Sequence, residues 1–124
     1  MTIGGPGLHE RLARVARRPR CRLTHWGRKT GRRYEVTIWF LVDGGTVYLA
    51  TADRRRHWVQ NVLARPSVEL RIDGETFRVA VEPVTRPEEM AHVVDLLTRK
   101  YWLSRPYLWY RGVPDTAFRA RISG

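Results

Sequence analysis

Short stretches of alternating hydrophobic and polar residues run through this chain, and such alternation is typical of β-strands. Six segments alternate or carry mainly β-forming residues: 21–26, 34–42, 46–52, 67–72, 75–84 and 115–122. Segment 34–42 is apolar and aromatic almost throughout, which predicts a mostly buried strand. Tight turns at 43–45 (Asp-Gly-Gly) and 73–74 (Asp-Gly) predict two hairpins, and hairpins require antiparallel pairing.

Three further segments place apolar residues at helical spacing: 8–18, 57–64 and 86–101. Pro19 and Pro66 end the first two helices. Glu88 and Glu89 open the third, where carboxylates complement the helix macrodipole, and this explains them better than acid–base work does. Six short antiparallel strands close most economically into a small barrel without exposed edges. The pattern therefore predicts a mainly β (α+β) fold, a six-stranded antiparallel barrel with about three flanking helices.

The 124 residues, 43% of them hydrophobic, suit a single domain over residues 1–124 with one modest core. Most barrel strands and the second helix occupy 21–84, and an aromatic, proline-containing tail with the last strand occupies 102–122. Cys21 is the only cysteine, so no internal disulfide is expected. The N-terminus lacks the apolar region of a secretory signal, and no segment approaches the roughly 18 apolar residues of a spanning helix. We therefore expect a cytoplasmic protein.

The formal net charge of +11 favours an anionic partner, and the charge is unevenly distributed. Ten Arg or Lys residues and two Glu residues lie between Leu8 and Glu35, a local net charge of +8. Nucleic acid, an acidic membrane surface and a polyanionic small ligand all fit this balance. The basic amphipathic helix 8–18 leaves two interpretations open: it caps the core, or it makes a peripheral contact with a membrane surface.

The most informative segment is 27–33, Gly-Arg-Lys-Thr-Gly-Arg-Arg, between the first two predicted strands. Glycine permits tight turns and leaves backbone amides uncovered. Arginine offers a planar fork of donors, and lysine adds a compact charge. Such a loop on a rigid sheet can bind a phosphate or a carboxylate, although a solvated hairpin tip has the same composition. His25, in a strand pattern, is interpreted as a structural histidine, and the four histidines lack metal-ligand spacing, so no metal site is predicted.

The order of these motifs resembles a known family. A G-R-K-T-G loop (27–31) is followed by an aromatic strand, a D-G hairpin, a W-x-x-N helix ending near A-x-P (58–66) and a V-E-L-R-I-x-G-x-T-F hairpin (68–77). Over residues 21–101 the chain looks like the deazaflavin-dependent nitroreductase and quinone reductase family. That family has the split β-barrel shared with FMN-binding oxidases, and the resemblance implies the same fold here.

The resemblance also implies coenzyme F420, a deazaflavin with a ribityl phosphate and an oligoglutamate tail. The implied cofactor-binding residues are Arg28, Lys29, Thr30, Gly31, Thr37, Ile38, Trp39, Ala50, Thr51, Ala52, Arg54, Trp58 and Asn61. In this scheme the first three hold the phosphate, residues 37–39 place their backbone against the ring, and residues 50–52 form a neighbouring wall. Arginines at 32–33 and 54–56 reach the outer glutamates. Trp58 and Asn61 line or brace the pocket.

The resemblance implies hydride transfer from the reduced deazaflavin to a small hydrophobic acceptor: a quinone, a nitro compound or an activated alkene. The cofactor carries such chemistry, which agrees with the lack of a triad or a carboxylate pair in the sequence. Four side chains are candidates to donate the accompanying proton: Tyr101, Tyr107, Tyr110 and His57. The aromatic tail is either a lid over the acceptor or filler that seals the barrel.

Departures from the family keep alternatives open. Thr37 stands where members often carry Pro, and residues 53–57 replace a longer glycine-rich loop. FMN or haem could therefore replace F420, or the protein could carry F420 without catalysis. A basic nucleic-acid-binding module is a further alternative, but no RNA-binding signature appears. Split barrels often pair through their sheets while some relatives are monomers, so a homodimer also stays open.

Overall fold

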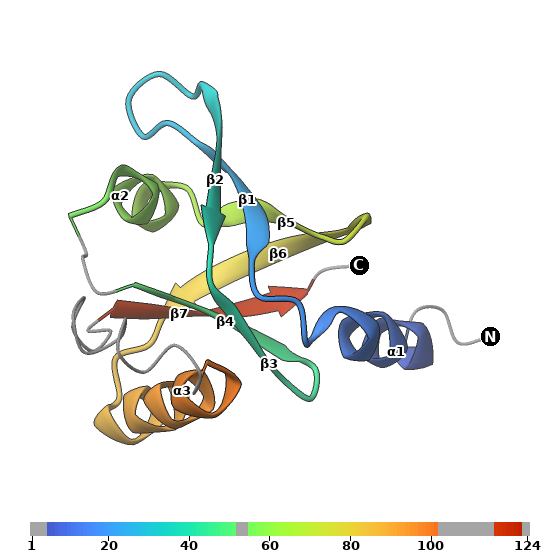
Figure 1. The fold of residues 1–124 in the computed structure, drawn as a ribbon. Coiled ribbons are helices and arrows are strands. Elements are labelled where there is room, and N and C mark those ends of the chain that lie inside the picture. The colour runs from blue at the N-terminus through green and yellow to red at the C-terminus, as the bar shows by residue number, and fades with distance from the viewer. Residues whose placement is uncertain (1–4, 52–54, 102–115, 123–124) are drawn as a thin grey trace.

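The computed structural model describes residues 5–51, 55–101 and 116–122 of the protein (Figure 1). Within them, seven strands form one antiparallel sheet that curls into a half-barrel, and three helices flank it. The strands are β1 (Cys21–Trp26), β2 (Arg33–Ile38), β3 (Phe40–Asp43), β4 (Thr46–Thr51), β5 (Ser67–Ile72), β6 (Glu75–Pro83) and β7 (Thr116–Ile122). The helices are α1 (Gly5–Val15), α2 (His57–Ala64) and α3 (Pro87–Lys100). The predicted mainly β, α+β class is confirmed.

The predicted number of six strands is wrong, because segment 34–42 forms two strands. β2 pairs with β1, whereas β3 pairs with β4, and the chain changes partner at Trp39. Ile38 and Phe40 belong to one hydrophobic cluster, and Trp39 and Leu41 to another. Side chains thus keep alternating through the change of partner, so the hydrophobic pattern contains no sign of it.

The strand order β2-β1-β5-β6-β7-β4-β3 places β2 and β3 at the two ends of the sheet. Because these strands are consecutive in the chain, the link at Trp39 joins the two ends of the curl. Closure into a barrel through strand pairing, as expected from the sequence, is therefore incomplete. β2 is also more exposed than predicted: among its side chains Tyr34, Glu35 and Thr37 are exposed, as suits an end strand.

Two hydrophobic clusters stabilise the sheet. The first includes the fully buried Phe40, Phe77 and Phe118, together with apolar residues of α1 and α2. The second lies under α3 and includes Val93 and Leu97 of that helix. Full burial of such a side chain contributes roughly 1.5–3 kcal/mol of transfer free energy, so these clusters fix the helices on the sheet.

α1 packs against the sheet through the apolar side chains that the structure describes. Leu12 and Val15 belong to the first cluster. Arg11 Nε donates to Glu75 Oε1 (2.9 Å), and its guanidinium lies 4.6 Å from the centroid of the Phe77 ring. These contacts support the core-capping interpretation of this helix, and a membrane contact through it stays a prediction. Among the described segments, no helix is both long and apolar enough to cross a membrane.

Most predicted boundaries agree with the structure. Strands 21–26 and 67–72 and helix 57–64 have the predicted bounds. α1 begins and ends three residues before the predicted 8–18, and the bounds of α3 and the end of β6 differ from the prediction by one residue. The predicted strand ends at 52 and 115 lie outside the described residues. Most of the aromatic tail, 102–115, lies outside the described residues.

Candidate cofactor site

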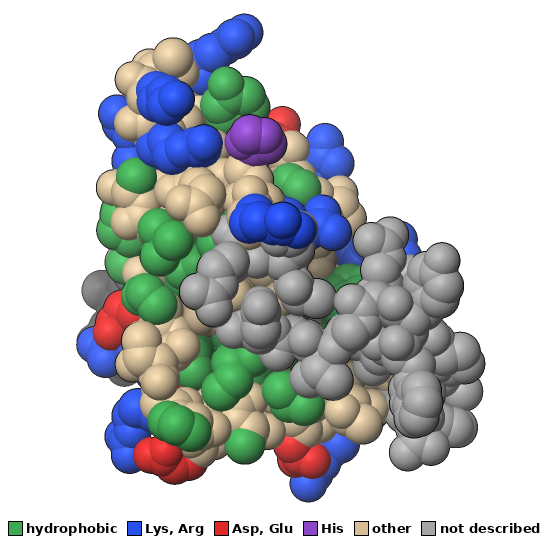
Figure 2. All heavy atoms as spheres, turned by 90° about the vertical axis from the view of Figure 1, so that its left-hand side faces the viewer, with side chains coloured by type: hydrophobic (Ala, Val, Ile, Leu, Met, Phe, Trp, Pro, Cys, Tyr) green, Lys and Arg blue, Asp and Glu red, His purple; other side chains and the backbone are tan. Residues whose placement is uncertain are grey.

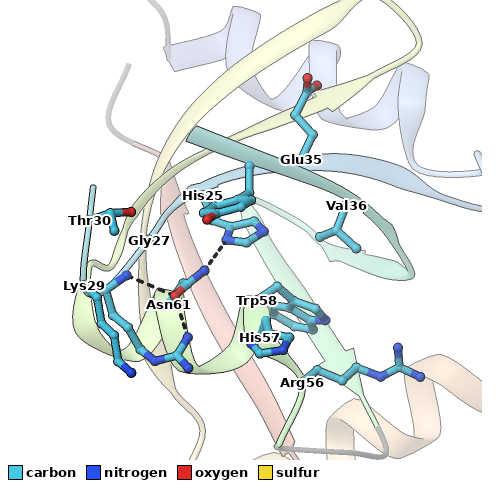
Figure 3. A pocket seen from close by; sticks show the side chains of 12 residues that line it. His25, Gly27, Lys29, Thr30, Glu35, Val36, Arg56, His57, Trp58 and Asn61 are labelled. Atoms are coloured by element: carbon cyan, nitrogen blue, oxygen red, sulfur yellow. Dashed lines mark hydrogen bonds between the residues drawn. The ribbon is translucent and has the colours of Figure 1, made fainter. Parts of the chain in front are cut away.

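An open cavity of about 640 Å³ lies between the β1–β2 hairpin and the first turns of α2 (Figure 3). This volume falls within the usual range of small-molecule sites. Its walls combine cationic, aromatic and aliphatic side chains. The lining residues are His25, Gly27, Arg28, Lys29, Thr30, Tyr34, Glu35, Val36, Arg56, His57, Trp58 and Asn61.

The loop between β1 and β2 is held in shape by its own backbone. The amide of Gly27 donates to the carbonyl oxygen of Arg32 (2.8 Å), and the amide of Gly31 donates to the carbonyl oxygen of Gly27 (2.9 Å). Gly31 has a φ of +74°, in the left-handed region that favours glycine. A Cβ added at Gly27 would lie 3.1 Å from a ring carbon of Tyr34, so a side chain would crowd this position.

Asn61 joins this loop to the helix. Its side chain is buried, and its Oδ1 accepts two hydrogen bonds from Arg28, one from the backbone amide (3.0 Å) and one from Nη1 (2.8 Å). Its Nδ2 lies 3.1 Å from Nδ1 of His25 (Figure 3). Trp58 and Val62 on the same helix are buried in the core and hold Asn61 in place. The first cation of the loop is therefore fixed by a buried amide.

His25 is part of the same network. The side chain is buried, and its ring stacks on that of Tyr34 at a centroid separation of 5.7 Å. Burial lowers the pKa of His25 below its ordinary value of 6.5, so the ring is neutral near pH 7. The ring of His25 is hydrogen-bonded and stacked, as expected of a structural histidine. It also lines the cavity.

The electrostatics of the site favour an anion. Arg28, Lys29 and Arg56 border the cavity. Glu35 is the one carboxylate among the described lining residues, and it also faces Arg22 and Arg33 at 3.5 Å each. Figure 2 views the face of the molecule on which α2 lies, and Lys and Arg side chains gather at its upper end and near its middle. Exposed cations of this kind attract phosphates and carboxylates, and the attraction is screened by salt.

The structure brings to the cavity seven of the side chains that were given cofactor or proton-donor roles from the sequence. They are Arg28, Lys29, Thr30, Arg56, Trp58, Asn61 and the candidate proton donor His57. Gly31 completes the loop beside them, and a Cβ at its position would lie 3.7 Å from the Arg65 guanidinium. Two distant segments, the loop and the helix, thus meet as the motif set implied.

Five other predicted residues lie outside the cavity lining formed by the described residues. Thr37 accepts a hydrogen bond from Arg22 (3.1 Å), and Ile38 belongs to the first cluster. Trp39 stacks on Tyr101, with 4.9 Å between ring centroids. Ala50 belongs to the second cluster, and Thr51 ends β4. Trp39 and Ala50 thus pack in the cluster under α3 and not at the cavity.

Tyr101 is also directed elsewhere. Its hydroxyl donates to the carbonyl oxygens of Pro19 (2.6 Å) and Phe40 (3.3 Å), and burial raises its pKa. The structure therefore does not bring this candidate proton donor to the cavity. The other predicted residues, Ala52, Arg54, Tyr107 and Tyr110, lie outside the described residues.

Sequence reasoning did not assign Tyr34, Glu35, Val36 or His25 to the site. A signal for His25 was available, because β1 and β2 form a hairpin around the basic loop. Pairing Trp26 with Arg33 places His25 opposite Tyr34, and the structure has this register. Extending the hairpin from the loop would have brought both rings to the loop's base.

A basic glycine-bounded loop and a W-x-x-N helix thus enclose one cavity, and comparison with known proteins agrees with this arrangement. Residues 9–108 match the sequence profile of the F420H(2)-dependent quinone reductase family. The chain belongs to this family. The resemblance inferred from the motifs is confirmed, and the family indicates coenzyme F420 as the cofactor of an F420-dependent reductase.

Solved structures share the fold. An F420-H2 dependent reductase (FDR-A) is 21% identical, with a TM-score of 0.65 over 84% of this chain and 95% of its own. A chain described as a domain-swapped dimer is 23% identical, with a TM-score of 0.66 over 84% of this chain and 81% of its own. Rv2991 from Mycobacterium tuberculosis is 18% identical, with a TM-score of 0.69 over 91% of this chain and 82% of its own.

Proposed function

We propose that the protein transfers a hydride from reduced F420 to a small hydrophobic acceptor, namely a quinone, a nitro compound or an activated alkene. The observation that carries the proposal is the cavity, whose rim is cationic and whose wall is aromatic and aliphatic. A planar ring with an anionic tail matches both parts. The family supports the cofactor, and the class of acceptor is the proposed part.

Three cations hold the anionic tail in this proposal. Arg28 has five donors in its guanidinium, and among the described residues its side chain bonds Asn61 through Nη1, which leaves other donors to face a phosphate. Lys29 and Arg56 add charge-assisted hydrogen bonds at the rim, where solvent access makes them weaker and sensitive to salt. The hydroxyl of Thr30 is a further cavity-side donor.

The walls suit the ring. Trp58 is buried with its indole at the cavity, and Tyr34 and Val36 add flat and aliphatic surface from β2. When bound, a deazaflavin supplies the hydride chemistry itself. The chain's part is therefore to orient the reactants, exclude water and provide a proton, for which His57 at the cavity is placed. A homodimer is also proposed, supported by the structural neighbour described as a dimer.

Titration with F420, followed by tryptophan fluorescence, tests the proposal. We expect micromolar or tighter binding, and a loss of about tenfold or more when Arg28 and Lys29 are both replaced by Ala. The control variant Arg17→Ala with Arg99→Ala removes the same charge from exposed positions outside the cavity lining and should bind normally. Lack of F420 binding at high micromolar concentration would overturn the proposal.

Parallel experiments separate the alternatives. Tighter binding of FMN than of F420 would assign a different cofactor, and tighter binding of single-stranded DNA at physiological salt would favour the nucleic-acid module. Oxidation of reduced F420 by menadione then distinguishes a reductase from a carrier, because a carrier binds the cofactor without turnover.

A further inference from the structure

The side-chain amide of Asn61 has one orientation. Its oxygen faces two donors of Arg28, the backbone N–H and Nη1, at 3.0 and 2.8 Å. Exchanging the amide oxygen and nitrogen would place NH₂ against both of these donors. Hydrogen-bond partners are the usual basis for assigning an amide, and here they agree. The NH₂ group of Asn61 therefore points to His25.

This orientation fixes the tautomer of His25. Nδ2 of Asn61 can only donate, so Nδ1 of His25, 3.1 Å away, accepts. A neutral imidazole with a bare Nδ1 carries its proton on Nε2. Protonation of Nδ1 would bring two donors together, which opposes the charged form. Burial of His25 acts in the same direction by lowering its pKa.

The protonated nitrogen reaches the cavity. Among the described residues, His25 makes its side-chain hydrogen bond at Nδ1, and no fully buried side-chain nitrogen or oxygen lacks a partner, so Nε2 is not fully buried. His25 lines the cavity, and Figure 3 shows its ring extending over the space between Val36 and Trp58. Nε2–H is thus the donor that His25 presents to a ligand, while the stacked Tyr34 restrains the ring.

We propose that His25 is a fixed, uncharged hydrogen-bond donor that binds a carbonyl oxygen of a planar conjugated ligand in the cavity. This proposal rests on the proposed function, because the carbonyl oxygen belongs to the deazaflavin or acceptor that the proposed function places in the cavity. The cations at the rim would select the anionic tail, whereas His25 would set the orientation of the ring. Such a donor also stabilises negative charge that develops on the oxygen during hydride transfer. The carbonyl belongs either to the deazaflavin or to the acceptor, and the experiment separates the two.

The first test is ¹⁵N NMR of the histidine side chains in the wild-type protein. We expect Nε2 of His25 to carry the proton and Nδ1 to be bare. Asn61→Asp is the matched variant, because its carboxylate still accepts hydrogen bonds from Arg28 but can only accept at the other oxygen, so Nδ1 of His25 must carry a hydrogen and donate it. That variant should show a protonated Nδ1. A protonated Nδ1 in the wild-type protein would overturn the proposal.

The second test follows ligands. Addition of F420 to the wild-type protein should shift the Nε2 resonance of His25 if the carbonyl is on the cofactor. His25→Phe keeps an aromatic ring over Tyr34 without the donor, and should weaken F420 binding about tenfold. His25→Gln restores a donor and should recover part of the loss. If the carbonyl is instead on the acceptor, F420 affinity stays unchanged and kcat/KM for menadione falls by a similar factor.

Three outcomes decide the proposal. A loss of F420 affinity or of kcat/KM for menadione in His25→Phe, with partial recovery in His25→Gln, supports the proposal and identifies which ligand carries the carbonyl. Unchanged F420 affinity and unchanged menadione kinetics in His25→Phe overturn it while the proposed function stands. Failure of the wild-type protein to bind F420 overturns both, and the tautomer measurement then shows whether the donor itself was assigned correctly. Thermal melts identify a variant that fails to fold, in which case the wild-type resonance shift decides.

Discussion

Lys100 lies over the ring of Phe40, with its Nζ 3.6 Å from the ring centroid and 2.8 Å from the carbonyl oxygen of the same residue. This contact joins the end of α3 to the start of β3, directly after the bend at Trp39. The aromatic face and the carbonyl oxygen both favour the ammonium group. Burial nevertheless lowers the pKa of Lys100 to about 8. The contact is therefore both an anchor and a source of pH dependence.

Replacing Lys100 by Met should change how stability responds to alkaline pH. The folded protein releases this proton near pH 8, whereas an unfolded lysine keeps it to about pH 10.4. Across that interval the unfolded state binds more protons, so the free energy of unfolding rises with pH. We expect the wild-type protein to gain stability relative to Lys100→Met between about pH 8 and pH 10. Urea unfolding at several pH values measures this.

Lys29, the chain's other lysine, is exposed in the loop between β1 and β2, and Lys29→Met provides the control for replacing a lysine by Met. Burial raises the pKa of Cys21 to about 12, whereas the charge of Lys100 lowers it, so Lys100→Met also changes how Cys21 titrates. Comparing the variants in a Cys21→Ala background removes this contribution. A wild-type advantage over Lys100→Met that does not change with pH would contradict the assignment.

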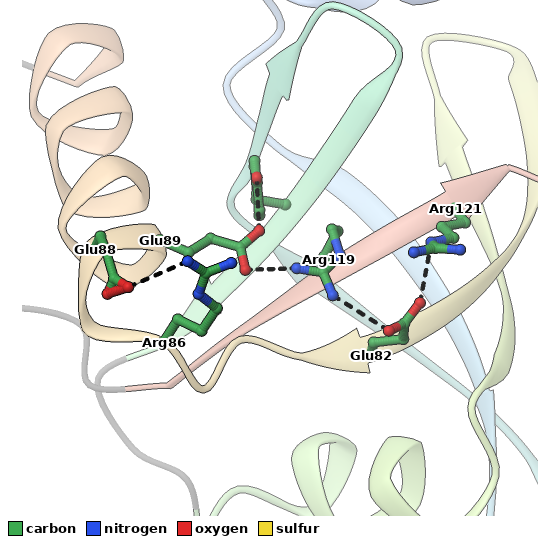
Figure 4. Close-up of polar contacts among 7 residues, drawn as sticks. Glu82, Arg86, Glu88, Glu89, Arg119 and Arg121 are labelled. Carbon is green, nitrogen blue, oxygen red and sulfur yellow. Dashed lines mark hydrogen bonds and ion pairs between the residues drawn. The ribbon is translucent and has the colours of Figure 1, made fainter.

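Glu89 is the centre of a second network, on the α3 side of the sheet (Figure 4). It accepts hydrogen bonds from the Tyr48 hydroxyl (3.0 Å) and from Arg119, which also bonds Glu82 at 3.2 Å. The Arg119 bond is the main reason that the pKa of Glu89 lies below its ordinary value. The stability it contributes is therefore present above the unfolded pKa and is lost as pH falls through the folded pKa.

Glu89→Gln should cost about 1–2 kcal/mol near neutral pH. The difference should shrink as the pH falls below about 4.3, the ordinary pKa of an unfolded Glu, and vanish below the lowered pKa of Glu89 in the folded protein. The neighbouring Glu88→Gln is the matched control. Glu88 faces Arg86 at 3.3 Å in an exposed pair, so its replacement should cost less than about 0.5 kcal/mol. If the two variants lose the same free energy of unfolding, the hydrogen bonds of Glu89 to Tyr48 and Arg119 add nothing beyond the favourable position of a carboxylate at the start of α3.

Most of the fold could be predicted because hydrophobic periodicity and turn residues are local. Segments 21–26 and 67–72 alternate, and the Asp73-Gly74 turn fixes the β5–β6 register. The split of segment 34–42 could not be predicted in this way. Which strand a segment pairs with depends on contacts distant in sequence, and the alternation of Ile38, Trp39 and Phe40 continues through the bend.

The site could be predicted in part for the same reason. The loop at 27–31 and the helix residues Trp58 and Asn61 were found as motifs, and the structure brings them together. Expected contacts at 37–39 and 50–51 came from the family resemblance alone, and the structure places Trp39 and Ala50 in the cluster under α3. The role of Asn61 in orienting His25 depends on which amide atom faces Arg28, and no pattern of residue types carries that information.

Gly31→Ala should weaken both stability and F420 binding. Its φ of +74° strains any residue with a Cβ by about 1–2 kcal/mol, and relief of the strain would reshape the loop that presents Arg28 and Lys29. Gly44 has a φ of +61° in the β3–β4 turn, outside the cavity lining, so Gly44→Ala should cost similar stability and leave F420 affinity unchanged. Chemical denaturation and fluorescence titration check both variants. Normal F420 affinity in a destabilised Gly31→Ala would separate loop shape from binding.

Tyr101→Phe tests whether this candidate proton donor acts in catalysis or in folding. The hydroxyl donates to Pro19 and Phe40, so its removal leaves buried carbonyl oxygens without that partner and should cost about 1–2 kcal/mol. The ring stacking on Trp39 does not depend on the hydroxyl and should persist. Because the hydroxyl faces backbone acceptors outside the cavity lining, we expect menadione reduction to stay within about twofold of wild type. His57→Ala, at the cavity, should instead lower kcat with little change in stability. A large fall in kcat for Tyr101→Phe at unchanged stability would place Tyr101 in the reaction and contradict the arrangement described above.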